Sequence, residues 1–126
     1  MLVDNHLSRW ARTWAAVGAV ECAAIASSVY FRPSPVIGFL PGNDPLWAVA
    51  FFAIGAGFLG LAALVRAPRR FGIFTFCIAG TAHLTYGVGA LGYAVTQDQS
   101  WVLASAMFGL AALNFMAAWK IAGPRH

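Results

Sequence analysis

Two ionisable side chains stand inside stretches of sequence that are otherwise apolar, Glu21 in AVECAAIASS and His83 in GTAHLTYGVG. A carboxyl group and an imidazole can share one proton, either as an ion pair or as a neutral acid beside a neutral base. Such a pair can relay a proton or bind the polar group of a ligand. It can also be purely structural, as a hydrogen bond that aligns two helices, and the residue types leave both roles open.

The elements that would position these residues are four apolar stretches, at about residues 13–31, 46–65, 71–95 and 101–119. Each approaches or exceeds the roughly 20 residues with which a helix crosses about 30 Å of hydrocarbon. A chain of 126 residues with 60% hydrophobic and 10% charged residues has too little polar surface for a soluble domain. The sequence therefore predicts an all-α fold, a single antiparallel four-helix bundle over residues 1–126 that is integral to a membrane and in contact with the lipid bilayer.

The distribution of positive charge predicts how this bundle lies in the membrane. Seven of the eight basic residues fall on one side and Arg32 falls on the other. The seven are Arg9, Arg12, Arg66, Arg69, Arg70, Lys120 and Arg125. By the positive-inside rule, both termini are cytoplasmic, as expected for a multi-pass protein of a bacterial inner membrane or a plasma membrane. The positive net charge then reflects orientation, and nucleic acid is not an expected partner.

The connections between the spans predict which helices are neighbours. Two connections of about five residues favour adjacency of the second helix with the third and of the third with the fourth. The connection after the first span, RPSPVIGFLPGNDP, is longer and contains an apolar run at residues 36–40. We expect this run to cap the bundle or to lie in the membrane interface.

Helical spacing places the two ionisable residues at similar depth. Glu21 lies about eight residues, or roughly 12 Å, into the first span, and His83 lies about twelve residues, or roughly 18 Å, into the third. His83 shares its helix face with small residues and Tyr86, whereas Phe74, Leu84 and Val88 lie on the opposite face. The small-residue face is therefore expected to point into the bundle.

An unpaired carboxylate at this depth costs roughly 2.5–3.5 kcal/mol, so Glu21 needs a partner, and His83 offers the only titratable nitrogen there. We predict that the two residues meet and that, with Tyr86 and Asn114, they form a site for a ligand or a proton. No metal ion or other cofactor is expected. One histidine within the spans gives one axial haem ligand, and one acid is too few for a carboxylate di-metal site. Cys22 and Cys77 are far apart and in no C-x-x-C arrangement, which indicates small buried thiols rather than a disulfide or a zinc site.

The stretch GAGFLG, residues 55–60, matches the letters of a dinucleotide-binding loop but falls inside the second span. No acid follows within residues 75–85, as that fold would require. We interpret the stretch as a helix-packing surface formed by Ala53 with Gly57 and by Ala56 with Gly60.

Two family resemblances bear on function. The pattern His83-Leu84-Thr85-Tyr86-Gly87, followed by Gly89 and Gly92, resembles the third helix of DoxX-like four-helix bacterial membrane proteins, some of which are tied to quinone-linked thiol or sulfur oxidation. The lone Glu21 in the first span is similar to that of small multidrug resistance transporters, which implies exchange of protons for a cationic substrate. The longer first loop and the strong charge bias of this chain depart from the transporter pattern.

The main functional hypothesis is a small integral membrane protein with a binding or accessory role. Its expected partners are a small-molecule ligand and further membrane subunits or copies of the same chain. The alternatives are a proton-coupled small-molecule transporter and a membrane subunit of a quinone-linked oxidoreductase.

Overall fold

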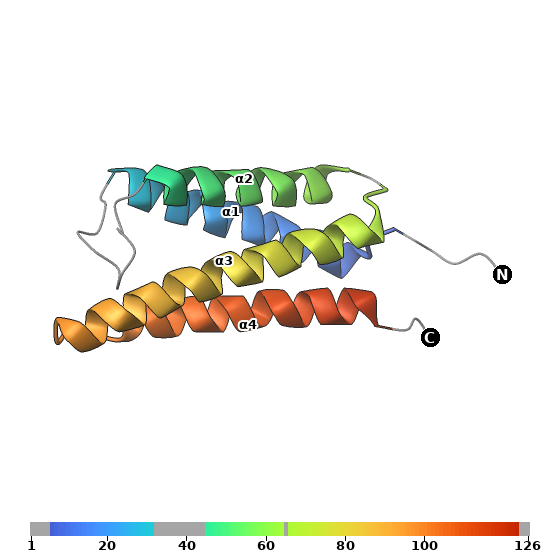
Figure 1. Ribbon diagram of the computed structural model, residues 1–126. Coiled ribbons are helices and arrows are strands. Elements are labelled where there is room, and N and C mark those ends of the chain that lie inside the picture. Colours follow the sequence, from blue (N-terminus) through green and yellow to red (C-terminus); the bar gives the residue numbers. More distant parts are fainter. Residues whose placement is uncertain (1–5, 32–44, 65, 124–126) are drawn as a thin grey trace.

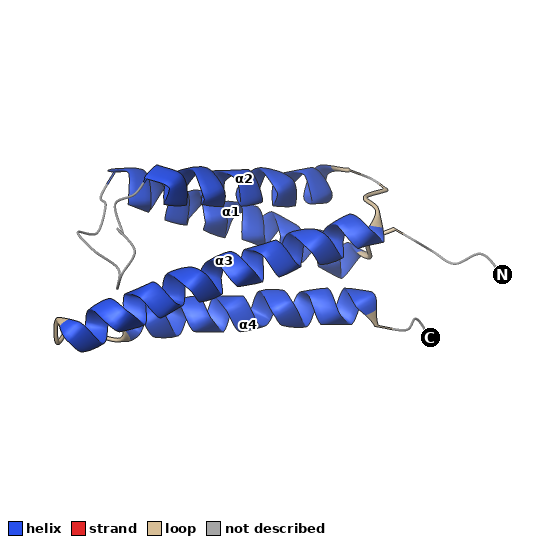
Figure 2. Cartoon of the chain, viewed as in Figure 1, coloured by secondary structure: helices blue, strands red, loops and turns tan. Residues whose placement is uncertain are grey.

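The computed structural model of the chain describes residues 6–31, 45–64 and 66–123 (Figure 1). It contains four helices, α1 (Arg9–Phe31), α2 (Pro45–Ala63), α3 (Arg69–Thr96) and α4 (Val102–Ala122). All four are long and apolar enough to cross a membrane, and consecutive helices run antiparallel. The predicted all-α class is confirmed, with four antiparallel helices of membrane-spanning length. Within the described parts of the chain, helix is the dominant structure and no strand is formed (Figure 2).

The ends of the helices lie close to the predicted ends of the apolar stretches. Pro45 opens α2 and Pro68 immediately precedes α3, at positions where the missing proline N–H would have no helical partner. The turn between α3 and α4 contains Asp98 at a φ of 51°, a left-handed conformation that Asp tolerates better than most residues. The largest difference from the prediction is at α1, which begins at Arg9 rather than near residue 13.

The four helices pack as two hairpins, α1 with α2 and α3 with α4 (Figure 1). The predicted adjacency of α3 and α4 is therefore confirmed. The predicted adjacency of α2 and α3 holds only in part, because their backbones approach each other at few points. The short connection between them takes the chain from one hairpin to the other. The apolar run at residues 36–40 lies outside the described residues.

Glycines allow the backbones to approach closely within each hairpin. A Cβ at Gly55 of α2 would lie 3.4 Å from the Cβ of Cys22 in α1. A Cβ at Gly87 of α3 would lie 3.1 Å from the Cβ of Met107 in α4. The contact at Gly55 is an ordinary van der Waals contact, and the contact at Gly87 is tighter, so a larger side chain is disfavoured most at Gly87.

The predicted packing through Ala53, Ala56, Gly57 and Gly60 is met at one position. Ala53 and Ala56 are exposed and nothing lies within 4 Å of a Cβ added at Gly60, whereas a Cβ at Gly57 would lie 3.5 Å from Cγ2 of Thr75 in α3. Gly55 is the glycine that faces α1. Because α2 is apolar on all sides, its sequence does not distinguish the face toward a helix from the face toward lipid.

The basic residues gather at one end of the bundle, which we call the basic end: Arg9, Arg12, Arg66, Arg69, Arg70 and Lys120. Two of these arginines cap helix C-termini. Arg12 of α1 donates to the Ala62 carbonyl of α2 at 2.9 Å, and Arg69 of α3 donates to the Ile121 and Gly123 carbonyls at 2.6 Å each. The last carbonyls of a helix lack helical hydrogen-bond donors and carry partial negative charge. A guanidinium supplies both the donors and a compensating positive charge. Each arginine thus closes one hairpin.

Candidate functional site

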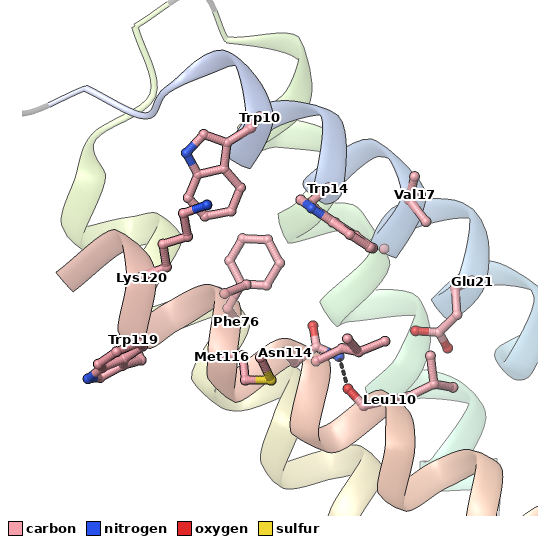
Figure 3. A pocket seen from close by; sticks show the side chains of 13 residues that line it. Trp10, Trp14, Val17, Glu21, Phe76, Leu110, Asn114, Met116, Trp119 and Lys120 are labelled. Atoms are coloured by element: carbon pink, nitrogen blue, oxygen red, sulfur yellow. Dashed lines mark hydrogen bonds between the residues drawn. The ribbon is translucent and has the colours of Figure 1, made fainter. Parts of the chain in front are cut away.

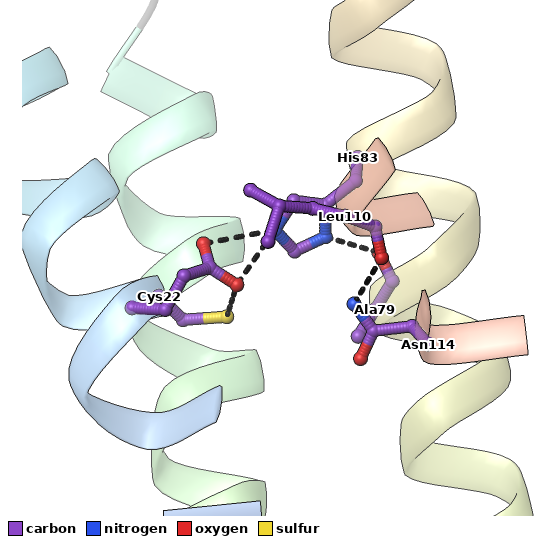
Figure 4. Close-up of polar contacts among 6 residues, drawn as sticks. Cys22, Ala79, His83, Leu110 and Asn114 are labelled. Carbon is purple, nitrogen blue, oxygen red and sulfur yellow. Dashed lines mark hydrogen bonds and ion pairs between the residues drawn. The ribbon is translucent and has the colours of Figure 1, made fainter. Parts of the chain in front are cut away.

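The predicted pairing of Glu21 with His83 is confirmed. His83 is completely buried on the small-residue face of α3, between Ala79 and Tyr86, and the bulky residues of the opposite face are exposed. Its Nε2 atom lies 2.9 Å from each of the two carboxyl oxygens of Glu21 in α1 (Figure 4). This contact joins the two hairpins near the middle of the spans.

The hydrogen bond made by the other ring nitrogen of His83 indicates that His83 and Glu21 share one proton. Nδ1 is 2.6 Å from the carbonyl oxygen of Ala79, one turn earlier in α3. A carbonyl only accepts, so Nδ1 must carry a hydrogen and donate it. Nε2 then either donates to a Glu21 carboxylate or accepts from a protonated Glu21. In both forms, one proton lies between Nε2 and the carboxyl group, and the remaining lone pairs of Glu21 can only accept hydrogen bonds.

A third reactive side chain adjoins the pair. The thiol sulfur of Cys22 is 3.9 Å from Oε1 of Glu21, and the cysteine is completely buried against α2 (Figure 4). The donor atoms of Glu21, Cys22 and His83 all lie within 4.8 Å of one another. Cys22 was predicted only as a small buried thiol and not as a member of the site. The signal available in the sequence was its position directly after Glu21.

Aromatic rings enclose His83 on the side of α2 and α3. Phe51 meets the imidazole edge-to-face at a centroid distance of 5.3 Å and also contacts Tyr86 at 6.0 Å. Trp47 meets Tyr86 edge-to-face at 4.9 Å. Since Phe51 is completely buried, this cluster separates the imidazole from the surroundings on that side. Phe51 was not anticipated, because an apolar span gives no sign of which phenylalanine faces inward.

A cavity of about 260 Å³ lies on the other side of Glu21, between α1 and α4 (Figure 3). Its walls are mainly apolar, with Phe76 of α3 at its back. The residues of α1 and α4 that line it are Trp10, Trp14, Val17, Gly18, Glu21, Leu110, Leu113, Asn114, Met116, Ala117, Trp119 and Lys120. Trp14, Leu113 and Met116 are also exposed at the surface of the bundle, where a membrane protein meets lipid. The cavity is therefore accessible from the bilayer.

Polar groups are few in this cavity and lie at separate depths (Figure 3). Glu21 is at the end nearest the middle of the spans, and its side chain is 21% exposed, in contrast to 0% for His83. Lys120 is at the basic end, where its Nζ lies 4.7 Å from the centre of the Trp10 ring in a cation–π contact between α4 and α1. Glu21 thus connects the buried imidazole with a space that a ligand can enter.

The other two predicted site residues, Asn114 and Tyr86, lie in different surroundings. Asn114 is buried in the cavity wall, and its side-chain amide donates to the Leu110 carbonyl of its own helix at 2.8 Å. Tyr86 belongs to the aromatic cluster around His83 and does not line the cavity. The structure therefore brings Glu21 and His83 into contact, places Asn114 in the wall of the cavity that Glu21 also lines, and places Tyr86 in the aromatic cluster around the imidazole.

Comparison with protein-family models, curated proteins and solved structures finds no match to this chain. What the structure establishes is a four-helix protein with four membrane-length helices and a buried Glu21–His83 pair. Neither of the two family resemblances receives support beyond this general layout.

Proposed function

We propose that this membrane protein has a binding role, in which the cavity between α1 and α4 takes up a small apolar molecule from the bilayer and Glu21 holds its polar group. The observation that carries the proposal is the double position of Glu21. Its carboxyl group is hydrogen-bonded to the buried His83 and is also part of the wall of the cavity.

The hydrogen-bonding state of the pair favours a ligand that donates. Because the shared proton lies between His83 and Glu21, the carboxyl oxygens can offer the ligand only lone pairs. A carboxyl group in an apolar cavity gains most from a directional donor such as a hydroxyl or amine. The ligand is thus an apolar molecule with one hydrogen-bond donor group.

The walls of the cavity limit the size and character of the rest of the ligand. At about 260 Å³, the cavity is slightly smaller than the range of roughly 300–1,000 Å³ typical of sites for drug-sized ligands. Trp10, Trp14 and Phe76 offer aromatic surface to an apolar or aromatic body. A single-ring molecule with a hydroxymethyl group has suitable dimensions and chemistry.

The test compares two fluorinated probes, 4-(trifluoromethyl)benzyl alcohol and its methyl ether, by ¹⁹F NMR of the protein in nanodiscs with a metal chelator. Empty nanodiscs correct for partition into lipid. We expect saturable binding of the alcohol and binding of the ether that is weaker by about tenfold, as loss of a hydrogen bond to a charged group implies. Equal binding of alcohol and ether would contradict the proposed donor contact.

Two substitutions, each with a matched control variant, locate the binding. Glu21→Gln should weaken alcohol binding by about tenfold because a neutral amide is a poorer acceptor. Asp98→Asn, which makes the same chemical change in the exposed α3–α4 turn, should leave it unchanged. Leu113→Trp should block the cavity, and the matched Leu84→Trp on the exposed face of α3 should not. Uptake of a solute that requires a pH gradient would instead indicate the alternative, a proton-coupled transporter.

The same proposal includes an orientation, with the basic end in the cytoplasm. Single cysteines at Arg66, at the basic end, and at Gln99, in the α3–α4 turn, test it in a background with Cys22→Ser and Cys77→Ser. Both positions are exposed. A membrane-impermeant maleimide added to intact cells should label Gln99→Cys and leave Arg66→Cys unlabelled until the cells are opened. The reverse pattern would contradict the orientation.

A further inference from the structure

We propose that Glu21, Cys22 and His83 form a binding site for a divalent transition-metal ion of the zinc class. The three side chains supply a carboxylate oxygen, a thiol sulfur and an imidazole nitrogen, and these donor atoms lie within 4.8 Å of one another. They come from two hairpins, since Glu21 and Cys22 belong to α1 and His83 belongs to α3. This inference is independent of the ligand proposed for the cavity.

The orientation of His83 is that of a metal-binding histidine. Its Nδ1 donates to the Ala79 carbonyl at 2.6 Å, which directs Nε2 toward Glu21 and Cys22. Histidines that bind metal ions commonly donate their second ring N–H to a carbonyl or carboxylate in this manner, which holds the ring in place. Nε2 can therefore bind the metal ion through its lone pair once its proton has been displaced.

The spacing of the donors is close to that of a tetrahedral metal site. Metal bonds of about 2.0–2.3 Å at tetrahedral angles separate neighbouring donors by roughly 3.3–3.7 Å. In the structure, Nε2 lies 2.9 Å from each Glu21 oxygen, and the Cys22 sulfur lies 3.9 Å from Oε1. The first separation must widen and the second must shorten by a few tenths of an ångström, and the Cys22 sulfur and the His83 nitrogen, within 4.8 Å of each other, must approach by up to about 1.3 Å.

Charge balance favours a divalent ion at this depth. A carboxylate, a thiolate and a neutral imidazole together carry two negative charges, which one divalent cation neutralises. On binding, the ion replaces two protons, the thiol proton of Cys22 and the proton shared by Glu21 and His83. The cluster is neutral before and after, so the ion adds no net charge to the middle of the spans, where net charge is costly.

The donor set also selects the kind of metal ion. Sulfur and nitrogen donors prefer zinc and related transition metals, whereas magnesium and calcium prefer oxygen. Three protein donors leave a fourth tetrahedral position, as in zinc sites that exchange a water or a substrate. Of the three residues, Glu21 lines the cavity, so this position is reached from the cavity side.

The test uses tag-free protein in nanodiscs, freed of metal and kept reduced, and titrates it with Co²⁺ alone. We expect one Co²⁺ per chain, visible d–d bands of a tetrahedral ion and a thiolate-to-cobalt charge-transfer band in the near ultraviolet. Zn²⁺ should remove these bands, and Mg²⁺ at the same concentration should not. X-ray absorption at the zinc edge should then find one sulfur neighbour among nitrogen and oxygen neighbours.

The two cysteines of the chain offer a matched pair of variants. Cys22→Ser should abolish the charge-transfer band and weaken Co²⁺ binding at least tenfold, whereas Cys77→Ser, on α3 and outside the cluster, should retain both. Absence of the band in the wild-type protein, or its retention in Cys22→Ser, would overturn the proposal. Alcohol binding is measured with a chelator present. The proposed ligand site in the cavity and the proposed metal site can therefore fail separately.

Discussion

The two hairpins and the interface between them are held together in different ways. Within the hairpins, helix backbones approach closely at glycines, as at Gly55 against Cys22 and at Gly87 against Met107. Between the hairpins, contact depends on large or polar side chains, the Glu21–His83 pair and rings such as Phe58 against Phe76 at 4.9 Å. The cavity also lies between helices of different hairpins, α1 and α4.

This difference shows where a membrane protein of this size can hold a buried polar pair and a ligand cavity. Close backbone contact leaves no room for a ligand, but it makes each hairpin a well-packed unit, and at Gly55 it accommodates only the small side chain of Cys22. Two such units that meet through side chains leave space for a buried polar group and a cavity beside it. The candidate site thus occupies the more loosely packed interface, and the hairpins position it.

The largest effect is expected from breaking the close contact within a hairpin. Gly87→Val adds a side chain whose Cβ would lie 3.1 Å from both Met107 and Phe108, so α3 and α4 must move apart. We expect a loss of about 1–3 kcal/mol in unfolding free energy, the usual cost of overpacking. The measurement is reversible unfolding in micelles. Gly109→Val on α4, where nothing lies within 4 Å of the added Cβ, is the control and should change stability much less.

A smaller effect is expected from breaking the polar contact between the hairpins. Hydrogen bonds within membranes average about 0.6 kcal/mol and reach about 1.7 kcal/mol in double-mutant cycles. A cycle of Glu21→Gln and His83→Ala, measured in micelles with a chelator present, should therefore show a coupling of about 0.5–2 kcal/mol. Additive effects of the two substitutions would mean that the pair does not join the hairpins.

The smallest effect is expected at the basic end, where water and lipid headgroups can replace a lost contact. Arg69→Gln removes the guanidinium that caps the last carbonyls of α4 and should cost about 0.5–1 kcal/mol. Arg70→Gln makes the same change at an exposed neighbour and serves as the control. If both variants lose the same stability in micelles, the cap contributes nothing specific to the α3–α4 hairpin.

The sequence alone was sufficient to predict the four spans and the meeting of Glu21 with His83. Span length follows from the thickness of the bilayer, and depth follows from the helical rise per residue, so two residues in different helices can be assigned to one level. The cost of an unpaired carboxylate in hydrocarbon then indicates a partner at that level. The small residues around His83 also predicted which face of α3 points into the bundle, because bulky side chains in membrane helices tend to face lipid.

Only the tertiary structure decided which faces of the other helices meet. In a membrane, the lipid side and the packed side of a helix are both apolar, so hydrophobic periodicity does not reveal the contact face of α2. The sequence therefore did not reveal that Gly55, rather than Gly57 or Gly60, contacts α1. It also did not reveal that Cys22, interpreted as a small buried thiol, belongs to the site. The cavity and the separation of Asn114 from Tyr86 depend on how the two hairpins are set against each other, which is determined by side-chain contacts between residues far apart in sequence.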